Sequence, residues 1–453
     1  MSTQLALASI AELSNRLQTR DISAAHLLEL YAERIERYAD SSKAFISLDL
    51  AAARSKAEAA DRNLDSGLIL NGIPYACKDL FDVAGQATTA GSKVLQDNIA
   101  DSDADAIRHM NQAGAIYIGK NNLHEFAYGA TGENLLYGTA ANPYDHSRLA
   151  CGSSSGSAAA VGFGLCAAAL GTDTGGSVRA PAALCGLVGF KPTFGRVSTA
   201  GVIPYSWTLD HVGTLTRSTE DAASLFKALL PAAQDIPQVT LQGQVIGIPE
   251  GFFFERCDPE ILDSVDLLMS FLRSAGAVLK PISMPSMEHT RTVSLTVQMP
   301  EALSFHNRYL EERGHLYSQD FRAGLALGQC LLAEQYIRAK RFIETYRRDM
   351  DAIFAGVDAI LTPATPVIAP AIGSVEISVD GIPEPVGNAI TRYTSFFNMT
   401  GHPAITLPCG MHSAGLPIGA QLVGKHHGDE QLLGLASLIE TDYDFTLPLP
   451  DLD

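Results

Sequence analysis

Residues 151–192 have the sequence CGSSSGSAAAVGFGLCAAALGTDTGGSVRAPAALCGLVGFKP, the most distinctive stretch of the chain. Glycine, serine and alanine dominate it, and small residues let one backbone segment approach another closely. The adjacent Gly175 and Gly176 can turn sharply and present several main-chain N–H groups to one point, as an oxyanion hole or a phosphate loop requires. No lysine stands where a G-x-x-x-x-G-K-[ST] phosphate loop needs one, so nucleotide binding is disfavoured.

Ser177 stands directly after this glycine pair. A hydroxyl nucleophile there would lie beside N–H groups that can hold the tetrahedral intermediate of acyl transfer. Close helix packing without any catalytic role explains the composition equally well. From the residues alone, hydrolytic acyl chemistry is therefore one of two open interpretations.

Short apolar runs on both sides of this stretch alternate with helical patterns, which is typical of strands covered by helices. Within the stretch, residues 156–171 form a weakly polar run too short to span a bilayer, and we expect a buried helix followed by a buried strand. Further apolar runs predict strands at 115–118, 167–170, 245–248 and 359–361. The fold class is therefore α/β.

Helix signals mark both ends of the chain. Two amphipathic helices are expected at the start, one beginning near Ser9 and one over residues 23–35. Ser218 is typical of an N-cap, and Asp429 and Glu430 place acid in the first turn of a late helix. The P-x-x-P at 363–370 is interpreted as a stiff loop after a strand.

The composition is that of a folded globular protein, with 46% hydrophobic and 18% charged residues over a length of 453. A net charge of −18 disfavours attraction to phosphate backbones and anionic membranes, so we expect neither nucleic acid nor membrane as a partner. Seven scattered cysteines without C-x-x-C indicate reduced thiols, and the N-terminus has no visible export signal. We therefore expect a cytoplasmic protein.

Three separated blocks resemble the amidase signature family. Residues 151–157 (CGSSSGS) resemble its G-G-S-S-G-G-S-like loop, with departures at Cys151 and Ser155. Residues 171–181 (GTDTGGSVRAP) match its G-T-D-x-G-G-S-x-R-x-P run, and residues 72–79 (GIPYACKD) its G-x-P-x-x-x-K-D element. The similarity covers about 68–223, returns at 393–433, and is faint between about 235 and 390.

The resemblance implies one α/β domain with a mixed central sheet covered by helices on both faces, and a Ser-Ser-Lys triad. Ser177 would be the acylating nucleophile, Ser153 a bridging hydroxyl after a cis peptide bond, and Lys78 the base. The implied oxyanion hole consists of the N–H groups of Thr174, Gly175, Gly176 and Ser177. The single domain, 1–453, is expected to comprise an N-terminal helical cap (1–64), a signature core (65–225), a variable substrate-side region (235–390) and a C-terminal return to the core (391–445).

The residues support these roles independently. A serine hydroxyl needs a base within hydrogen-bond reach, and a lysine can serve when burial lowers its pKa. Lys78 follows an apolar run that suits such burial. Asp173 and Arg179 flank the nucleophile, and we favour a structural ion pair that shapes the glycine turn over contact with substrate.

By resemblance, the acyl pocket would be lined by Phe126, Tyr128, Gly129, Thr131 and Trp207, although aromatic residues here are equally compatible with a core. The expected reaction cleaves a carboxamide to a carboxylate and ammonia or an amine. We expect a small-molecule amide as substrate and no cofactor or metal, since the chain has no H-E-x-x-H motif. A homo-oligomer is compatible with the sequence.

Two alternatives stay open. The first is the A subunit of a glutamine-dependent tRNA amidotransferase, a member of the same family that works only in a complex. Such subunits show a G-Y-Y-D-A-Y-Y-like stretch where this chain has EQYIRAK at 334–340, so a free-standing amidase is favoured. The second is an α/β-hydrolase with Ser154 in a G-x-S-x-G motif and one of four histidines as base, namely His402, His412, His426 or His427.

Overall fold

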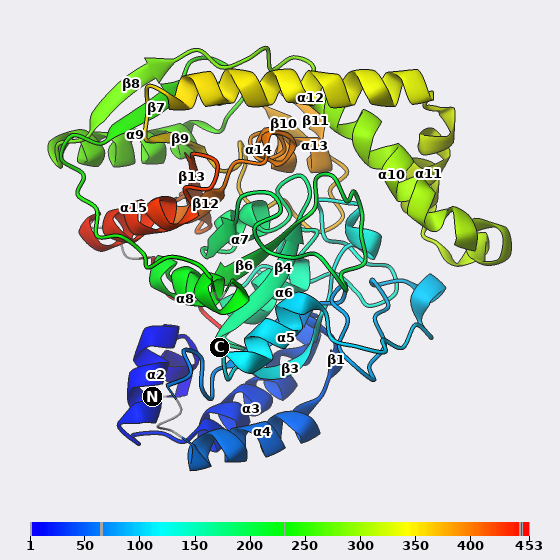
Figure 1. The fold of residues 1–453 in the computed structure, drawn as a ribbon, viewed down its shortest axis with the longest axis vertical. Coiled ribbons are helices and arrows are strands. Elements are labelled where there is room, and N and C mark those ends of the chain that lie inside the picture. Colours follow the sequence, from blue (N-terminus) through cyan, green and yellow to red (C-terminus); the bar gives the residue numbers. More distant parts are fainter. Residues whose placement is uncertain (1, 64–66, 231, 444, 446, 453) are drawn as a thin grey trace.

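The computed structural model describes residues 2–63, 67–230, 232–443, 445 and 447–452. In this part of the chain one mixed sheet runs through the whole molecule (Figure 1). Its eleven strands have the spatial order β1 (Phe45–Leu48), β3 (Ile116–Asn121), β2 (Pro74–Lys78), β4 (Ala168–Asp173), β6 (His211–Thr216), β5 (Val188–Lys191), β12 (Ala404–Met411), β13 (Pro417–Gly424), β9 (Ala359–Pro363), β7 (Val245–Pro249) and β8 (Val278–Ile282). A separate hairpin pairs β10 (Glu376–Val379) with β11 (Ile382–Pro385).

The helices of the described chain cover this sheet and extend beyond it. They are α1 (Ser2–Ala6), α2 (Ile10–Gln18), α3 (Ala24–Ser42), α4 (Leu50–Arg62), α5 (Asp105–Gln112), α6 (Ser155–Gly162), α7 (Arg179–Leu184), α8 (Thr219–Leu229), α9 (Pro259–Ser274), α10 (Thr290–Arg313), α11 (Gln319–Cys330), α12 (Ala333–Phe354), α13 (Val386–Thr391), α14 (Phe396–Thr400) and α15 (Asp429–Asp442). The sheet is mixed because β3, β2 and β4 are parallel while β6 runs antiparallel to β4. The predicted α/β class with a mixed sheet between helices is confirmed.

Helix and strand predictions agree with the structure near the N-terminus and in the signature core. Ser9 and Ser23 cap α2 and α3, each accepting a hydrogen bond from a backbone N–H three residues later. The weakly polar run at 156–171 forms most of α6 and leads into β4, both fully buried. The strands predicted at 115–118, 245–248 and 359–361 correspond to β3, β7 and β9.

Two adjacent parallel strands bring the signature blocks together. In β2 and β4, Cys77 lies opposite Leu170, so the residues that follow each of them end their strands at the same edge of the sheet. Lys78 ends β2 and Asp173 ends β4. The loop before α6 and the glycine turn before α7 lie at this edge, so chain segments about 75 to 100 residues apart meet there.

The middle of the chain adds an outer helical layer. α10 packs against α11, α12 and α14, and Figure 1 shows α10 and α11 to one side of the sheet, with α12 running back from them toward β7 and β9. Among the described residues, none of these helices is long and apolar enough to cross a membrane, nor is any other helix.

Candidate active site

Lys78 lies fully buried at the end of β2 and contacts two hydroxyls. Its Nζ is 2.7 Å from Ser153 Oγ and 2.9 Å from Thr172 Oγ1. Burial lowers the pKa of Lys78 to about 7, although Asp210 and Asp173 favour the protonated form. The neighbouring carboxylate of Asp79 is paired with Lys120 at 3.3 Å. Lys78 is therefore a lysine whose neutral form is accessible near neutral pH.

Ser153 and Ser177 lie on the two loops that meet at Lys78. The peptide bond between Gly152 and Ser153 is cis. Ser177 follows the glycine turn after β4, and its carbonyl accepts a hydrogen bond from the N–H of Ser154 at 3.3 Å, which joins the two loops. The structure thus gathers the three residues of the predicted triad at one edge of the sheet.

Asp173 and Arg179 hold the glycine turn in shape. Arg179 is fully buried and donates through Nε and Nη2 to the two carboxylate oxygens of Asp173, at 3.0 and 2.9 Å. Burial alone would raise the pKa of Asp173, but the charge and hydrogen bonds of Arg179 hold it below its usual range. The carboxylate also accepts from the N–H groups of Gly176 and Val178. The ion pair between Asp173 and Arg179 therefore has a structural role, as we expected from the sequence.

The N–H groups of the turn divide into two sets. Gly176 donates its N–H to Asp173 at 2.8 Å, so this donor is already used inside the turn. The N–H groups of Thr174, Gly175 and Ser177 have no acceptor within the described chain. The sequence does not distinguish among the four N–H groups of the predicted oxyanion hole. The folded turn shows that Asp173 already accepts a hydrogen bond from one of them.

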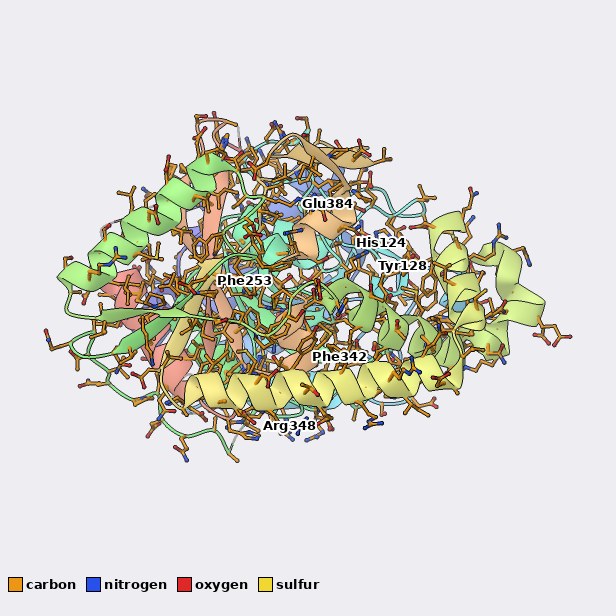
Figure 2. All side chains as sticks on the ribbon, turned by 90° about the horizontal axis from the view of Figure 1, so that it is seen from above. His124, Tyr128, Phe253, Phe342, Arg348 and Glu384 are labelled. Carbon is orange, nitrogen blue, oxygen red and sulfur yellow. The ribbon has the colours of Figure 1, made fainter. Side chains whose placement is uncertain are left out.

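A cavity of about 200 Å³ lies over Ser177 and the turn residues Thr174 and Gly175. One wall comes from the 127–130 segment and Tyr205, and another from α10. Tyr128 of the first wall packs on Phe321 of α11, with ring centroids 5.2 Å apart, and lies where the core meets the outer helices (Figure 2). Residues of α10, within the 235–390 segment, therefore contribute directly to the cavity over Ser177.

The residues predicted to contact the acyl group are divided among three places. Tyr128 and Gly129 line the cavity over Ser177. Phe126 is buried against the ring of Phe321, and Thr131 lies 3.4 Å from Nδ1 of His124. Trp207 is half-exposed and lies at a neighbouring cavity.

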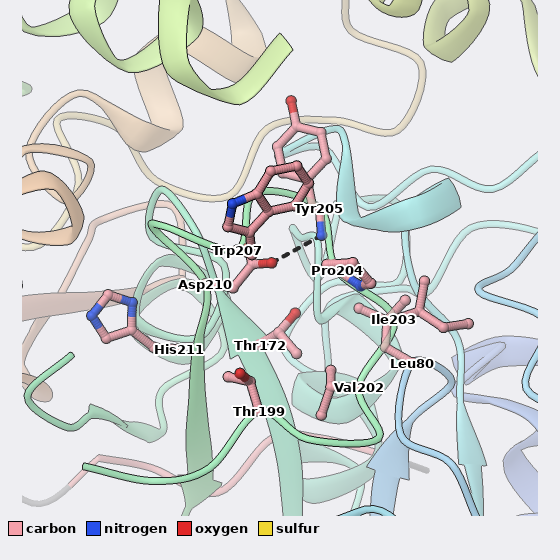
Figure 3. A pocket seen from close by; sticks show the side chains of 10 residues that line it. All are labelled: Leu80, Thr172, Thr199, Val202, Ile203, Pro204, Tyr205, Trp207, Asp210 and His211. Carbon is pink, nitrogen blue, oxygen red and sulfur yellow. Dashed lines mark hydrogen bonds between the residues drawn. The ribbon is translucent and has the colours of Figure 1, made fainter. Parts of the chain in front are cut away.

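This neighbouring cavity, of about 170 Å³, shares Tyr205 with the cavity over Ser177, and Figure 3 shows the residues that line it. Asp210 lines it and accepts from the N–H of Tyr205 at 2.9 Å, shown as the dashed line in Figure 3, and from Thr174 Oγ1. Burial raises the pKa of Asp210, although these hydrogen bonds oppose the rise. Thr172, which contacts Lys78, also lines this cavity.

Ser154 has a different environment from the one an α/β-hydrolase nucleophile requires. Its hydroxyl donates to the carbonyl of Thr172 at 3.2 Å, and the residue is fully buried next to α6. His426 lies 2.7 Å from the carbonyl of Thr400, and His412 lies beside Asp258. Within the described residues no histidine forms a hydrogen bond with Ser154, which disfavours this alternative.

Sequence reasoning missed the residues that α10 contributes to the cavity, namely Arg291, Ser294, Leu295, Gln298 and Met299. Four of them, at 291, 294, 295 and 298, recur at the spacing of one helix face. Their helical period could have been detected in the sequence. Which face points to the nucleophile could not, because α10 follows Ser177 by more than 100 residues.

Comparison with known proteins gives close relatives over almost the whole chain. The A subunit of the glutamyl-tRNA(Gln) amidotransferase of Vesicomyosocius okutanii is 32% identical, covering 98% of this chain and 98% of that protein. A crystal structure described as an amidase is 36% identical with a TM-score of 0.90, covering 96% and 99% of the two chains. A structure described as a vestigial protein complex that reveals the origins of an s-triazine catabolic enzyme is 32% identical with a TM-score of 0.91, covering 97% and 100%.

The amidotransferase relative corrects the expectation about partners. We expected a small amide and no nucleic acid, whereas the name of this relative includes a tRNA and designates one subunit of a larger enzyme. The net negative charge opposes only direct attraction between the chain and phosphate. It does not exclude an acidic subunit whose complex acts on a tRNA, so the exclusion of nucleic acid was wrong.

The match to a family model covers most of the chain. A model described as amidase matches residues 26–433, which include the three signature blocks and the outer helices α10–α12. The faint similarity expected between 235 and 390 therefore lies within the family domain. The chain belongs to the amidase family, the amidase signature hydrolases that act on carbon–nitrogen bonds.

Proposed function

We propose that the chain cleaves a carboxamide through an acyl-enzyme on Ser177, with Ser153 and Lys78 as the proton path. The observation that carries this proposal is the 2.7 Å contact between Lys78 Nζ and Ser153 Oγ in a fully buried site. Burial lowers the pKa of Lys78 to about 7, which supplies the neutral amine that a base requires.

In the proposed mechanism, neutral Lys78 accepts the proton of Ser153, which takes the proton of Ser177. Ser177 Oγ then forms a bond to the amide carbon. The negative oxygen of the tetrahedral intermediate is held by the N–H groups of Thr174, Gly175 and Ser177, whose lack of an acceptor in the described chain supports this role. The departing nitrogen leaves with a proton returned through Ser153, and water repeats the sequence to release the carboxylate.

A labelling experiment tests this assignment. A fluorophosphonate should modify Ser177, and Ser177→Ala should lose both labelling and at least about 10³-fold of the turnover, because the attacking oxygen is gone. Ser154→Ala is the matched control and should keep labelling at Ser177. Full turnover by Ser177→Ala would exclude the mechanism, and loss in Ser154→Ala alone would favour the Ser154 alternative.

We further propose that this chemistry serves as the amide-cleaving part of an amidotransferase-type complex, which releases ammonia from glutamine. The relatives support this setting, since A subunits of glutamyl-tRNA(Gln) amidotransferases match over 98% of the chain. The 36% identity to a structure described simply as an amidase supports a second candidate, a free-standing amidase, as does the divergent segment at 334–340.

The two settings differ in what the purified chain does alone. An amidotransferase component should hydrolyse glutamine slowly by itself and at least about tenfold faster with its partner proteins and acceptor tRNA. A free-standing amidase should turn over a small amide at full rate without them. Glutamine and a panel of small amides, assayed with and without partner proteins, decide between the two.

A further inference from the structure

Arg291 has the single formally charged side chain among the described residues that line the cavity over Ser177. The other polar lining residues are neutral serine, threonine, tyrosine and glutamine side chains. Within the described chain, the guanidinium of Arg291 forms no hydrogen bond or ion pair. A group with five N–H donors thus borders the cavity of the proposed nucleophile without a protein acceptor among the described residues.

The surroundings of Arg291 do not neutralise it. The side chain of Arg291 is exposed, but partial desolvation by the surrounding protein lowers its pKa, while Tyr205, Tyr128 and Glu384 oppose this effect. Glu384 (Figure 2) is itself paired with Arg256 at 3.2 Å, so it is not available as a dedicated partner. The cavity therefore has an uncompensated positive charge at its wall.

The N-terminal end of α10, where Arg291 lies, adds further positive potential at the cavity wall. Arg291 lies in the first turn of α10, which begins at Thr290, and the N-cap residue His289 makes no side-chain cap. The positive end of a helix dipole disfavours a cation in that turn and favours an anion. An anion bound in the cavity would interact favourably with both the guanidinium and the helix end.

We propose that the substrate is a small amide that also has a carboxylate, and that Arg291 binds this carboxylate while the amide carbonyl lies at Ser177. This inference rests on the proposed role of Ser177. A planar guanidinium matches the two oxygens of a carboxylate in a bidentate pair. A cavity of about 200 Å³ can accommodate a substrate of a few carbon atoms. Glutamine and the monoamides of short dicarboxylic acids belong to this class.

The test uses pairs of substrates that differ only in this charge. Succinamate and glutaramate have one carboxylate, and succinamide and glutaramide replace it with a neutral carboxamide of the same shape. The wild-type chain, assayed with any partner protein it requires, should favour the anionic member by at least about tenfold in kcat/KM, as expected for a charge-assisted hydrogen-bonded pair.

Variants then assign this preference to Arg291. Arg291→Gln should lower kcat/KM for the anionic amides by at least about tenfold and change the diamides by less than about threefold. Arg291→Lys should retain part of the preference, because it keeps the charge and loses the planar fork. Arg322→Gln is the matched control, since Arg322 is an exposed arginine of α11 outside the cavity, and it should change neither class.

The outcomes separate this inference from the proposed function. Equal turnover of both members of each pair, or an equal loss for both in Arg291→Gln, would overturn the carboxylate assignment while fluorophosphonate labelling of Ser177 persists. Failure of labelling, with no hydrolysis of any amide, would instead overturn the role of Ser177 and the inference with it.

Discussion

Lys78 is the residue whose protonation should control the rate. Burial lowers its pKa to about 7, and only the neutral amine can accept a proton. We therefore expect kcat/KM to rise with pH along one acid limb centred near pH 7 and to level off about one unit higher. Steady-state rates between about pH 5.5 and 9 check this, and a flat profile would contradict it.

Substitution of Lys78 by another cation should not preserve the activity. Lys78→Arg should lose at least about 10³-fold of the activity, since a guanidinium does not deprotonate in this range. Lys93→Arg, at an exposed lysine, should be unaffected. Near-wild-type activity of Lys78→Arg would exclude lysine as the base.

The lowered pKa of Lys78 should also make the free energy of unfolding depend on pH. Because the pKa of Lys78 falls from 10.5 to about 7 on folding, the unfolded chain binds more protons between these values. The free energy of unfolding should therefore gain an upward slope as pH rises through this window, and Lys78→Met should remove that slope. Urea titrations at pH 7 and 9, for wild type and variant, measure the difference.

Gly175 and Gly176 are adjacent, but they should respond differently to a methyl group. A Cβ on Gly176 would overlap Thr394 Oγ1, and its φ of +128° is strained for an alanine. A Cβ on Gly175 would meet nothing closer than 3.8 Å. Gly176→Ala should lower the free energy of unfolding by about 2 kcal/mol or more, and Gly175→Ala by less than about 1 kcal/mol, in denaturant titrations. Equal stabilities would contradict this account of the turn.

At the scale of single residues, the sequence predicts which residues form the signature blocks. It does not predict which residues from other segments contact those blocks. The blocks around Lys78, Ser153 and Ser177 have enough specific residues to be recognised in the chain. The bond from the Gly176 N–H to Asp173 spans only three residues, but the motif does not show which of its N–H donors is used in this way. The position of Arg291 at the cavity depends on contacts between segments far apart in the chain.

Among the elements, α10 connects the outer helices to the loop that holds Tyr205. Glu301 of α10 is buried and accepts from Ser206 Oγ and Thr208 Oγ1, each at 2.7 Å, and from the hydroxyl of Tyr336 at 2.8 Å. Since Tyr205 precedes this loop segment and lines the cavity, we expect the position of α10 to affect the shape of the cavity.

Glu301→Gln should weaken this connection, because the amide nitrogen cannot accept the hydrogen bonds that the carboxylate accepts. We expect a loss of about 1–3 kcal/mol in the free energy of unfolding and a raised KM. Glu334→Gln on α12 removes an exposed pair with Arg338 and should cost less than about 1 kcal/mol. Calorimetry measures the stability of the two variants, and substrate titration measures their KM. Equal stability and equal KM for Glu301→Gln and Glu334→Gln would refute the coupling.

Local sequence patterns predict where helices and strands lie better than they predict which strands pair in the sheet. The caps at Ser9, Ser23 and Ser218 depend on a side chain and a backbone N–H three residues away, so the sequence contains the whole interaction. The pairing of β12 with β5, about 200 residues earlier, has no such local signal. The position of the C-terminal return in the middle of the sheet was therefore not predictable from local pattern.

At the scale of the whole molecule, β12 and β13 join two groups of strands. Strands from residues 45–216 lie on one side of this pair, and β9, β7 and β8 lie on the other. The edge with the proposed triad thus becomes part of one continuous sheet only when the C-terminal region has folded. Arg179 connects the signature core to the C-terminal region, because its guanidinium also donates to Gln421 of β13 and Asn398 of α14, each at 2.6 Å.

The stability of this buried network should depend on the charge of Asp173. Asp173→Asn would leave Arg179 without its charge partner, and we expect a loss of about 3–5 kcal/mol in the free energy of unfolding at pH 7. Asp21→Asn removes an exposed partner of Arg16 and should cost less than about 1 kcal/mol. Because folding lowers the pKa of Asp173, its contribution is fully present above the pKa of the unfolded carboxyl, near 3.8, and is lost as pH falls below it. The stability gap between wild type and Asp173→Asn should therefore narrow in urea titrations between about pH 5 and 3. A gap that stays constant over this range would show that the ionised Asp173 does not hold the two parts of the sheet together.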